Sequence, residues 1–246
     1  MLILSIDTSF AVCRVGLWKD GQILGEIAEN NKKSHSVKLM PLVEEILQNS
    51  GCCVKDVDVF ASVNGPGSYT GLRIGVTTCK LLGYSTEKPV VTVNTLDYLA
   101  RSLTDISDDS IVCSCIDARN ARVFFGIYFV TRNDNCYNFK QLCQYDADSV
   151  EIVTEKIIKF ANEYNVNCVY LTGDGFFPNK EHFVSALGDK IKYPDEKEIM
   201  GTSKAACDIA YEKFCSEKDV NVFKSENAEV FYLRMPHITI KTTSAD

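Results

Sequence analysis

The chain has 246 residues, of which 46% are apolar and 24% charged, and this is the composition of a globular protein with one large domain or two smaller ones. Its 26 Lys and Arg against 33 Asp and Glu give a net charge of −7, which argues against a protein that grips nucleic acid by itself. No apolar run approaches the roughly 20 residues of a membrane-spanning helix, and residues 2–6 lack the features of a signal peptide.

Eleven cysteines could indicate a disulfide scaffold, but the count is odd and the chain is large enough to fold without cross-links. Cys113, Cys115 and Cys168 lie inside apolar, strand-like runs, where a thiol behaves as a small buried hydrophobe. We therefore expect reduced cysteines in a cytoplasmic protein. The sequence has no C-x-x-C pair and its 3 histidines are scattered, so spacing predicts no metal site.

The first half of the chain begins with three predicted strands. Residues 2–7 form an apolar run that ends in Asp7, and the stretches 12–19 and 22–28 flank Asp20-Gly21, a dipeptide typical of tight β-hairpins. The elements that follow are a helix from Ser34 or Ser36 to Asn49 containing Pro41, a strand over 57–63, a helix from about Gly71 to Ser85, a strand over 90–94 and a short helix from Thr95 to Leu103.

The pattern restarts after the polar stretch 104–110, which we interpret as the seam between two halves. The predicted elements of the second half are a strand over 111–116 before Asp117, a hairpin of 122–130 and 136–145 around Asn133-Asp134-Asn135, a helix from Ser149 to Tyr164, a strand over 168–172 and a helix from about Asn179. We expect the last helix, 202–216, to pack back across the halves and the residues after Arg234 to be loose.

Both halves share one order of elements: a strand ending in Ile-Asp, a hairpin, a helix, a strand with a glycine-rich turn, and a helix. Ile6-Asp7 corresponds to Ile116-Asp117, and Gly65-Pro66-Gly67 corresponds to Gly173-Asp174-Gly175. Two βββαβα halves with mixed central sheets predict the α/β fold of the actin-like ATPases (ASKHA, ribonuclease H-like). The predicted divisions are halves at 1–103 and 104–200, a returning segment at 201–235 and a flexible tail at 236–246.

Two loops of the first half could hold an anion or a metal. Asp7-Thr8-Ser9 follows the first strand, where open α/β sheets bind ligands, although these residues could equally bond the local backbone. Residues 64–75, NGPGSYTGLRIG, place glycines before a helix whose free N–H groups suit an anion, or else form only a tight connection. The segment is neither a P-loop nor a dinucleotide fingerprint, because no Lys follows Gly71 and position 70 is Thr.

Three other places carry reactive side chains. Asp117-Ala118-Arg119 could supply an acid and a base to a cleft between the halves, or could close its own ion pair. His35 could act as a base, but no partner is evident and a helix-start or surface position is favoured. The thiols of Cys52 and Cys53 have only Lys55 as a basic neighbour, which makes a catalytic role weak.

Many of these motifs together resemble one known family. The matching residues are Ile6-Asp7-Thr8-Ser9, His35-Ser36, Leu39, Pro41-Leu42, the string GPGSYTGLRIG at 65–75, Lys80, Pro89-Val90, Val93, Leu96, Asp117-Ala118-Arg119 and Tyr232-Leu233-Arg234. They are dense over 1–125 and sparse over 130–230, and they are similar to the TsaB (YeaZ) family.

The resemblance implies an actin-like fold and a role in tRNA modification. TsaB proteins work with the paralogous catalytic subunit TsaD and the ATPase TsaE. These proteins transfer a threonylcarbamoyl group to the adenosine 3′ of the anticodon (t6A) in tRNAs that read codons beginning with A. The resemblance further implies that this chain is a non-catalytic scaffold, reaches tRNA only through the complex, forms a homodimer when alone and has no membrane contact.

Departures from the catalytic paralogue support a non-catalytic role. TsaD carries His-x-x-x-His where this chain has Thr95 and Leu99, and Asp97 is left without an imidazole partner, so we predict no metal site and no catalytic residue. The residues predicted to form a vestigial, at most weak, site for ATP or ADP are Asp7, Thr8, Ser9, Gly65, Gly67, Ser68 and Gly71. The residues predicted to face a partner subunit, on helices 36–49 and 71–85, are Val37, Met40, Val43, Leu47, Cys79, Leu82 and Gly83.

Three other functions stay open. An actin-like small-molecule kinase or acyltransferase would hold ATP in the interdomain cleft with Asp7 or Asp117 as base, which Gly173-Asp174-Gly175 supports only in part. A metallopeptidase is disfavoured by the scattered histidines and by the absence of H-E-x-x-H from the sequence. The third is an interaction protein unconnected with tRNA.

Overall fold

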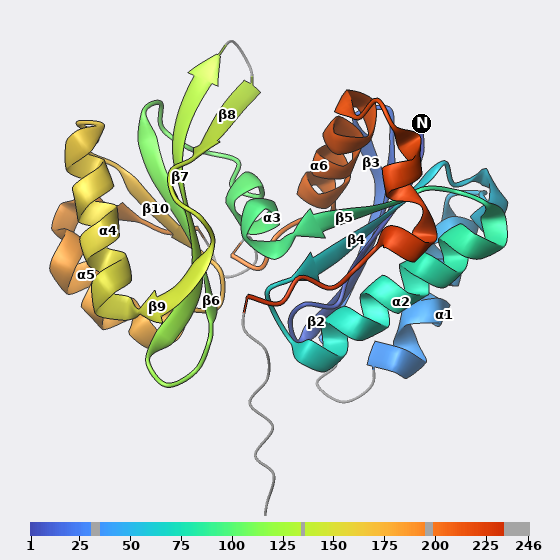
Figure 1. The fold of residues 1–246 in the computed structure, drawn as a ribbon, viewed down its shortest axis with the longest axis horizontal. Coiled ribbons are helices and arrows are strands. Elements are labelled where there is room, and N and C mark those ends of the chain that lie inside the picture. Colours follow the sequence, from blue (N-terminus) through green and yellow to red (C-terminus); the bar gives the residue numbers. More distant parts are fainter. Residues whose placement is uncertain (31–34, 134–135, 195–198, 234–246) are drawn as a thin grey trace, which may run out of the picture.

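The chain forms two α/β halves that stand side by side (Figure 1). The structure, a computed structural model, describes residues 1–30, 35–133, 136–194 and 199–233. Outside these ranges lie Ser34, Asp134-Asn135, Arg234 and the predicted tail 236–246. Within them, no helix has the length and apolar character needed to cross a membrane.

The first half is built on a five-stranded sheet in the order β3-β2-β1-β4-β5. Its elements are β1 (Leu2–Asp7), β2 (Val12–Lys19), β3 (Gln22–Asn30), α1 (His35–Asn49), β4 (Val59–Gly65), α2 (Tyr69–Thr86), β5 (Val90–Asn94) and α3 (Thr95–Arg101). Asp20 and Gly21 take positive φ values of 48° and 91°, as a tight hairpin requires, and they join β2 to β3. The strands β1, β4 and β5 run parallel because α2 crosses between β4 and β5.

The second half repeats this topology, with the order β11-β10-β6-β7-β8 and β9 paired to β7. Its elements are β6 (Ser110–Asp117), β7 (Arg122–Asn133), β8 (Cys136–Gln141), β9 (Asp146–Ser149), α4 (Val150–Glu163), β10 (Val169–Thr172), α5 (Lys180–Leu187) and β11 (Ile191–Lys192). Reading β6 as β1 and β10 as β4 gives the same strand order in both sheets, so the predicted duplicated, actin-like fold is confirmed. The sequence did not predict β9 and β11, because four- and two-residue strands carry too little hydrophobic pattern.

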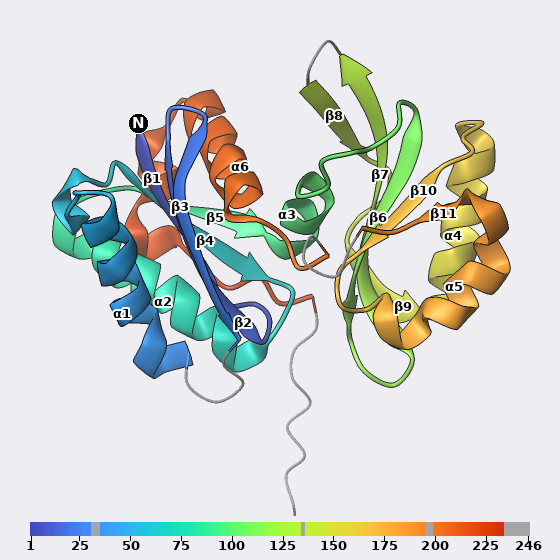
Figure 2. The same cartoon turned by 180° about the vertical axis from the view of Figure 1, so that it is seen from behind.

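Helices cover both faces of the first sheet (Figure 2). α1 and α2 pack on the face that carries Leu4 and Ile6, whereas α6 (Ser203–Ser216) packs on the face that carries Ile3. α6 therefore belongs to the first half. Residues 229–233, which we call the strap, then run back along α2 to the junction, where Phe231 contacts the Tyr145 ring of the second half.

The side chains predicted to face a partner lie on two different sides of α1 and α2. Val37 and Met40 are exposed, at 70% and 37%. The buried ones are Val43, Leu47, Cys79, Leu82 and Gly83. For these five the prediction is wrong, because the apolar face of each helix packs on its own sheet in the core with Leu4 and Ile6.

Candidate functional site

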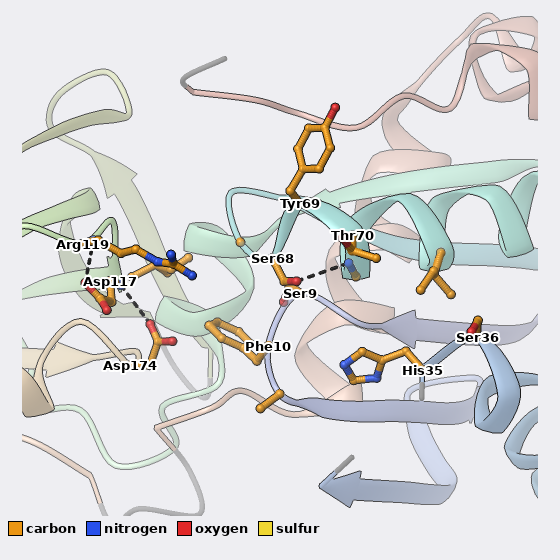
Figure 3. A pocket seen from close by; sticks show the side chains of 15 residues that line it. Ser9, Phe10, His35, Ser36, Ser68, Tyr69, Thr70, Asp117, Arg119 and Asp174 are labelled. Carbon is orange, nitrogen blue, oxygen red and sulfur yellow. Dashed lines mark hydrogen bonds between the residues drawn. The ribbon is translucent and has the colours of Figure 1, made fainter. Parts of the chain in front are cut away.

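A cavity of about 840 Å³ lies between the two halves, and we call it the interdomain cleft. One wall comes from the turn after β1 and from the starts of α1 and α2, and the other from the ends of β6 and β10 (Figure 3). The predicted site residues that line it are Ser9, His35, Gly67, Ser68, Gly71, Asp117, Arg119 and Asp174.

Asp7 and Thr8 lie behind this wall, in the interior. Asp7 is 4% exposed, and its Oδ1 accepts hydrogen bonds from the backbone N–H of Ser9 at 2.8 Å and from the Ser9 hydroxyl. Thr8 is fully buried, and its hydroxyl donates to the carbonyl of Gly71 at 2.7 Å. The Thr8 bond thus fastens the turn to the first turn of α2, 63 residues away in sequence, whereas the local bonds of the turn are those between Ser9 and the Asp7 carboxylate.

A buried arginine faces Asp7. Arg14 is 8% exposed and stands opposite Asp7 in the β1–β2 ladder, and its Nη1 bonds Oε1 of Glu26 at 2.5 Å. Burial raises the pKa of Asp7, while the hydrogen bonds from Ser9 and the charge of Arg14 oppose that rise. A metal cation at Asp7 would meet the repulsion of this guanidinium. Sequence reasoning missed Arg14, although an arginine inside an apolar strand signals a buried carboxylate partner.

Two glycines of the GPGSYTGLRIG segment allow close packing. A Cβ on Gly71 would lie 2.0 Å from the carbonyl oxygen of Thr8, so only glycine lets α2 approach the turn after β1. Gly65 has a φ of +127°, and a Cβ there would lie 2.3 Å from the carbonyl oxygen of Phe231. This segment therefore seats α2 against both the first strand turn and the strap.

Beyond the cap, the start of α2 is held by an aromatic stack that sequence reasoning did not predict. Ser68 caps the helix by accepting from the Gly71 N–H at 3.3 Å. The Arg73 guanidinium lies 4.0 Å from the Tyr69 ring centroid, and its Nε donates to the Tyr232 hydroxyl at 2.8 Å. The Tyr69 and Tyr232 centroids are 5.2 Å apart, so the strap closes over the beginning of the helix.

On the opposite wall, formed by the ends of β6 and β10, the polar side chains line the cleft. Oδ1 of Asp174 accepts the backbone N–H of Asp117 at 3.0 Å, and Oδ1 of Asp117 accepts that of Arg119 at 2.8 Å. Burial raises the pKa of Asp174 to about 6. The Arg119 side chain extends from its turn toward the start of α2, and Arg119, Asn120 and Ala121 all have positive φ (Figure 3). Asp117 is therefore hydrogen-bonded to the backbone of Arg119, and the Arg119 guanidinium points into the cleft.

The remaining candidates from the sequence are His35 and the cysteines, and the structure places them differently. His35 lines the cleft, and its Nδ1 is buried without a hydrogen-bond partner among the described residues. Cys52 is half-buried and Cys53 exposed, whereas Cys113 and Cys115 are buried as predicted and Cys168 only partly so. In the part of the chain that the structure describes, no cluster of three or more His, Cys, Asp or Glu side chains could hold a metal.

α3 holds the positions that carry the paired histidines in TsaD. Thr95 and Leu99 are both fully buried, and Leu99 packs in the core beside α6. Asp97 accepts hydrogen bonds from the hydroxyls of Tyr128, at 2.8 Å, and Tyr145. The sequence predicted only that Asp97 lacks an imidazole partner, and it did not indicate these two tyrosines because both belong to the other half.

Comparison with known proteins places the chain. A family model described as "TsaD: tRNA N6-adenosine threonylcarbamoyltransferase" matches residues 22–211. The Escherichia coli (strain K12) tRNA threonylcarbamoyladenosine biosynthesis protein TsaB is 30% identical over 239 residues, which cover 95% of each chain. The chain belongs to the TsaB (YeaZ) family. As a TsaB-family protein it is involved in the t6A modification of tRNA, and it is a paralogue of TsaD.

Solved structures agree with the TsaB fold. YeaZ from Pseudomonas aeruginosa has a TM-score of 0.71 at 21% identity and covers 94% of this chain and 100% of its own. A second P. aeruginosa structure, described as similar to peptidase YeaZ, has a TM-score of 0.75 at 23% identity, with 95% of this chain and 99% of the other covered. At these sequence identities the structural similarity supports the fold alone.

Proposed function

We propose that this TsaB-family chain is a non-catalytic scaffold subunit for t6A formation, acting with a TsaD-like catalytic paralogue and a TsaE-like ATPase. One observation carries the proposal: the positions that could supply a metal or phosphate site are used for packing. Asp7 and Thr8 bond their own neighbours, and Leu99 is buried in the core. The net charge of −7 fits a subunit that reaches tRNA only through its partners.

The outer faces of α1 and α2 form the proposed partner surface. Val37 and Met40 on α1 are exposed, as are Leu81 and Tyr84 on α2, at 64% and 78%. α1 contacts α2, so these four side chains lie on neighbouring helices and point away from the sheet. Methionine and aromatic side chains are enriched where protein surfaces meet. The same surface serves the proposed homodimer of the isolated chain.

Paired charge substitutions test this surface. The variants V37D/M40D and L81D/Y84D should each weaken binding to the TsaD-like paralogue at least about tenfold, as loss of interface anchors does. The control I152D/I158D changes two apolar side chains on α4 that are 40% and 37% exposed, and it should bind normally. Undiminished binding by both test variants, measured by calorimetry, would reject the surface.

Reconstitution tests the scaffold role. With the TsaD-like and TsaE-like proteins, ATP, a threonylcarbamoyl donor and tRNA, t6A should form only when this chain is added. The chain with ATP, donor and tRNA alone should form none. Either t6A formation by the chain alone or full activity of the partners without it would overturn the proposal.

Weak binding of ATP or ADP in the interdomain cleft is a subordinate part of the proposal. Ser68 and Arg119 offer a hydroxyl and a cation on a cavity of about 840 Å³, whereas the Ser9 hydroxyl already donates to Asp7. The Asp7 carboxylate, however, is buried behind the wall of the cleft and faces the charge of Arg14. Calorimetry of the isolated chain should therefore detect at most weak nucleotide binding, whereas tight binding or ATP turnover would favour the small-molecule kinase or acyltransferase alternative.

A further inference from the structure

α3 lies between the two halves and packs against both (Figure 1). On one side it contacts β4, β5 and α6 of the first half, and on the other it contacts β6 and β7 of the second. Domain closure around a ligand needs a hinge that can absorb rotation. A packed helix at this position opposes such rotation, because any change of angle must break its contacts on one side.

Polar contacts strengthen this junction. Oδ1 of Asp97 accepts the hydroxyl of Tyr128 at 2.8 Å and also that of Tyr145. Tyr128 is 2% exposed and lies on β7, while Tyr145 lies in the segment before β9, so one carboxylate holds two separate parts of the second half. Hydrogen bonds to an ionised acceptor are about twice as strong as neutral ones.

The strap joins the second half at the same tyrosine. The Phe231 and Tyr145 rings pack edge to face with centroids 6.3 Å apart. Phe231 is fixed to the first half because its N–H donates to the Asn64 carbonyl at 2.8 Å, and the Asn64 amide donates to the Glu229 carbonyl at 2.9 Å. Tyr145 is therefore held from α3 and from the strap together.

Charged groups around Asp97 complete the junction. A cavity of about 230 Å³ beside it is lined by Arg101, Glu212 and Lys213, among others, so positive and negative side chains alternate there. Arg101 pairs with Glu212 of α6 at 2.6 Å, and its guanidinium carbon lies 5.8 Å from the ring centroid of Phe139 on β8. Arg101 thus makes a second link from the first half to the β7–β8 hairpin.

We propose that α3 and the strap form an interdomain lock, in which Asp97 holds Tyr128 and Tyr145 and fixes the angle between the halves. The lock presents the two halves to a partner as one rigid body and prevents the cleft from closing on a ligand. It depends on contacts within the chain and stands whether or not the scaffold proposal holds.

Distance measurement between the halves tests the lock. Cys53 and Cys136 are exposed, one in each half, and can carry spin labels once Cys52, Cys143, Cys168 and Cys215 are changed to serine. In this background the distance distribution should be narrow. The variants D97A and Y128F/Y145F should broaden or shift it, and D97N, which keeps a neutral acceptor, should have a smaller effect.

The matched control is Y164F, which removes a hydroxyl that bonds Lys140 within the second half and should leave the distribution unchanged. Hydrogen exchange of the α3 amides should rise about ten- to a hundredfold in Y128F/Y145F, as expected for losing bonds to a charged acceptor. Circular dichroism must show each variant folded. If D97A unfolds, Y128F/Y145F decides, because it keeps both rings. An unchanged distance distribution and unchanged exchange in folded Y128F/Y145F would overturn the lock.

Discussion

The turns after β1 and β6 hold equivalent places in the two halves, yet their carboxylates have opposite surroundings. Asp7 is buried opposite Arg14 and bonded to Ser9, whereas Asp117 is exposed and lines the cleft with Asp174. The first turn has become part of the core that seats α2, while the second remains a solvent-facing wall. The two walls of the interdomain cleft therefore differ, because the carboxylate of one is part of the core and that of the other faces solvent.

Of the substitutions that test this contrast, removal of Arg14 should lower the free energy of unfolding the most. The variant R14M leaves the buried Asp7 without the positive charge opposite it and removes the ion-pair partner of the more exposed Glu26, so the free energy of unfolding should fall by about 3 kcal/mol. The matched change on the other wall, R119M, removes an exposed cation and should alter it by less than about 0.5 kcal/mol. Urea unfolding of both variants measures the difference, and equal losses would contradict the contrast.

A methyl group at Gly71 should have the next largest effect. In G71A the new Cβ would collide with the Thr8 carbonyl, so α2 must shift and the free energy of unfolding should fall by about 1–3 kcal/mol. G25A is the control, because its Cβ would lie 3.5 Å from the Ile46 side chain in ordinary contact. A G71A protein as stable as G25A would show that the glycine is not needed for packing.

The smallest expected effect is the pH dependence of stability that Asp174, on the second wall, causes. Asp174 has a folded-state pKa of about 6 against its ordinary 3.8, so the folded protein binds this proton more tightly than the unfolded chain. The resulting stabilisation is complete below about pH 3.8 and is lost as pH rises through 6. At pH 7.5, D174N should therefore be more stable than the native protein by about 1–2 kcal/mol, and at pH 3.8 the two should be alike. Equal stability of the two proteins at both pH values, measured by urea unfolding, would show that Asp174 is not destabilised by burial.

Local sequence signals predicted most of the fold. Asp20-Gly21 indicated the first hairpin, and the Ile-Asp strand ends indicated the duplication. The second helix was predicted to begin near Gly71, but α2 begins at Tyr69 because the Ser68 side chain caps it. β9, with the sequence DADS, was missed because its pairing with β7 comes from tertiary contact and not from β propensity.

The candidate site was predictable in its components but not in their arrangement. Ser9, Ser68, Asp117 and Arg119 were found from motifs, and all four line the cleft. Arg14 escaped notice, since its role depends on the register that sets it opposite Asp7.

By itself the sequence determined the kinds of elements, their duplicated order and the family, because these depend on local patterns and motif residues. Only the tertiary structure decided which of these side chains are exposed to solvent or a partner and which are buried in internal contacts. Hydrophobic periodicity marks an apolar helix face without saying what covers it, and Val43 and Cys79 proved to face their own sheet. Asp97 likewise found Tyr128 and Tyr145 across the junction, because contacts between residues distant in sequence leave no local pattern.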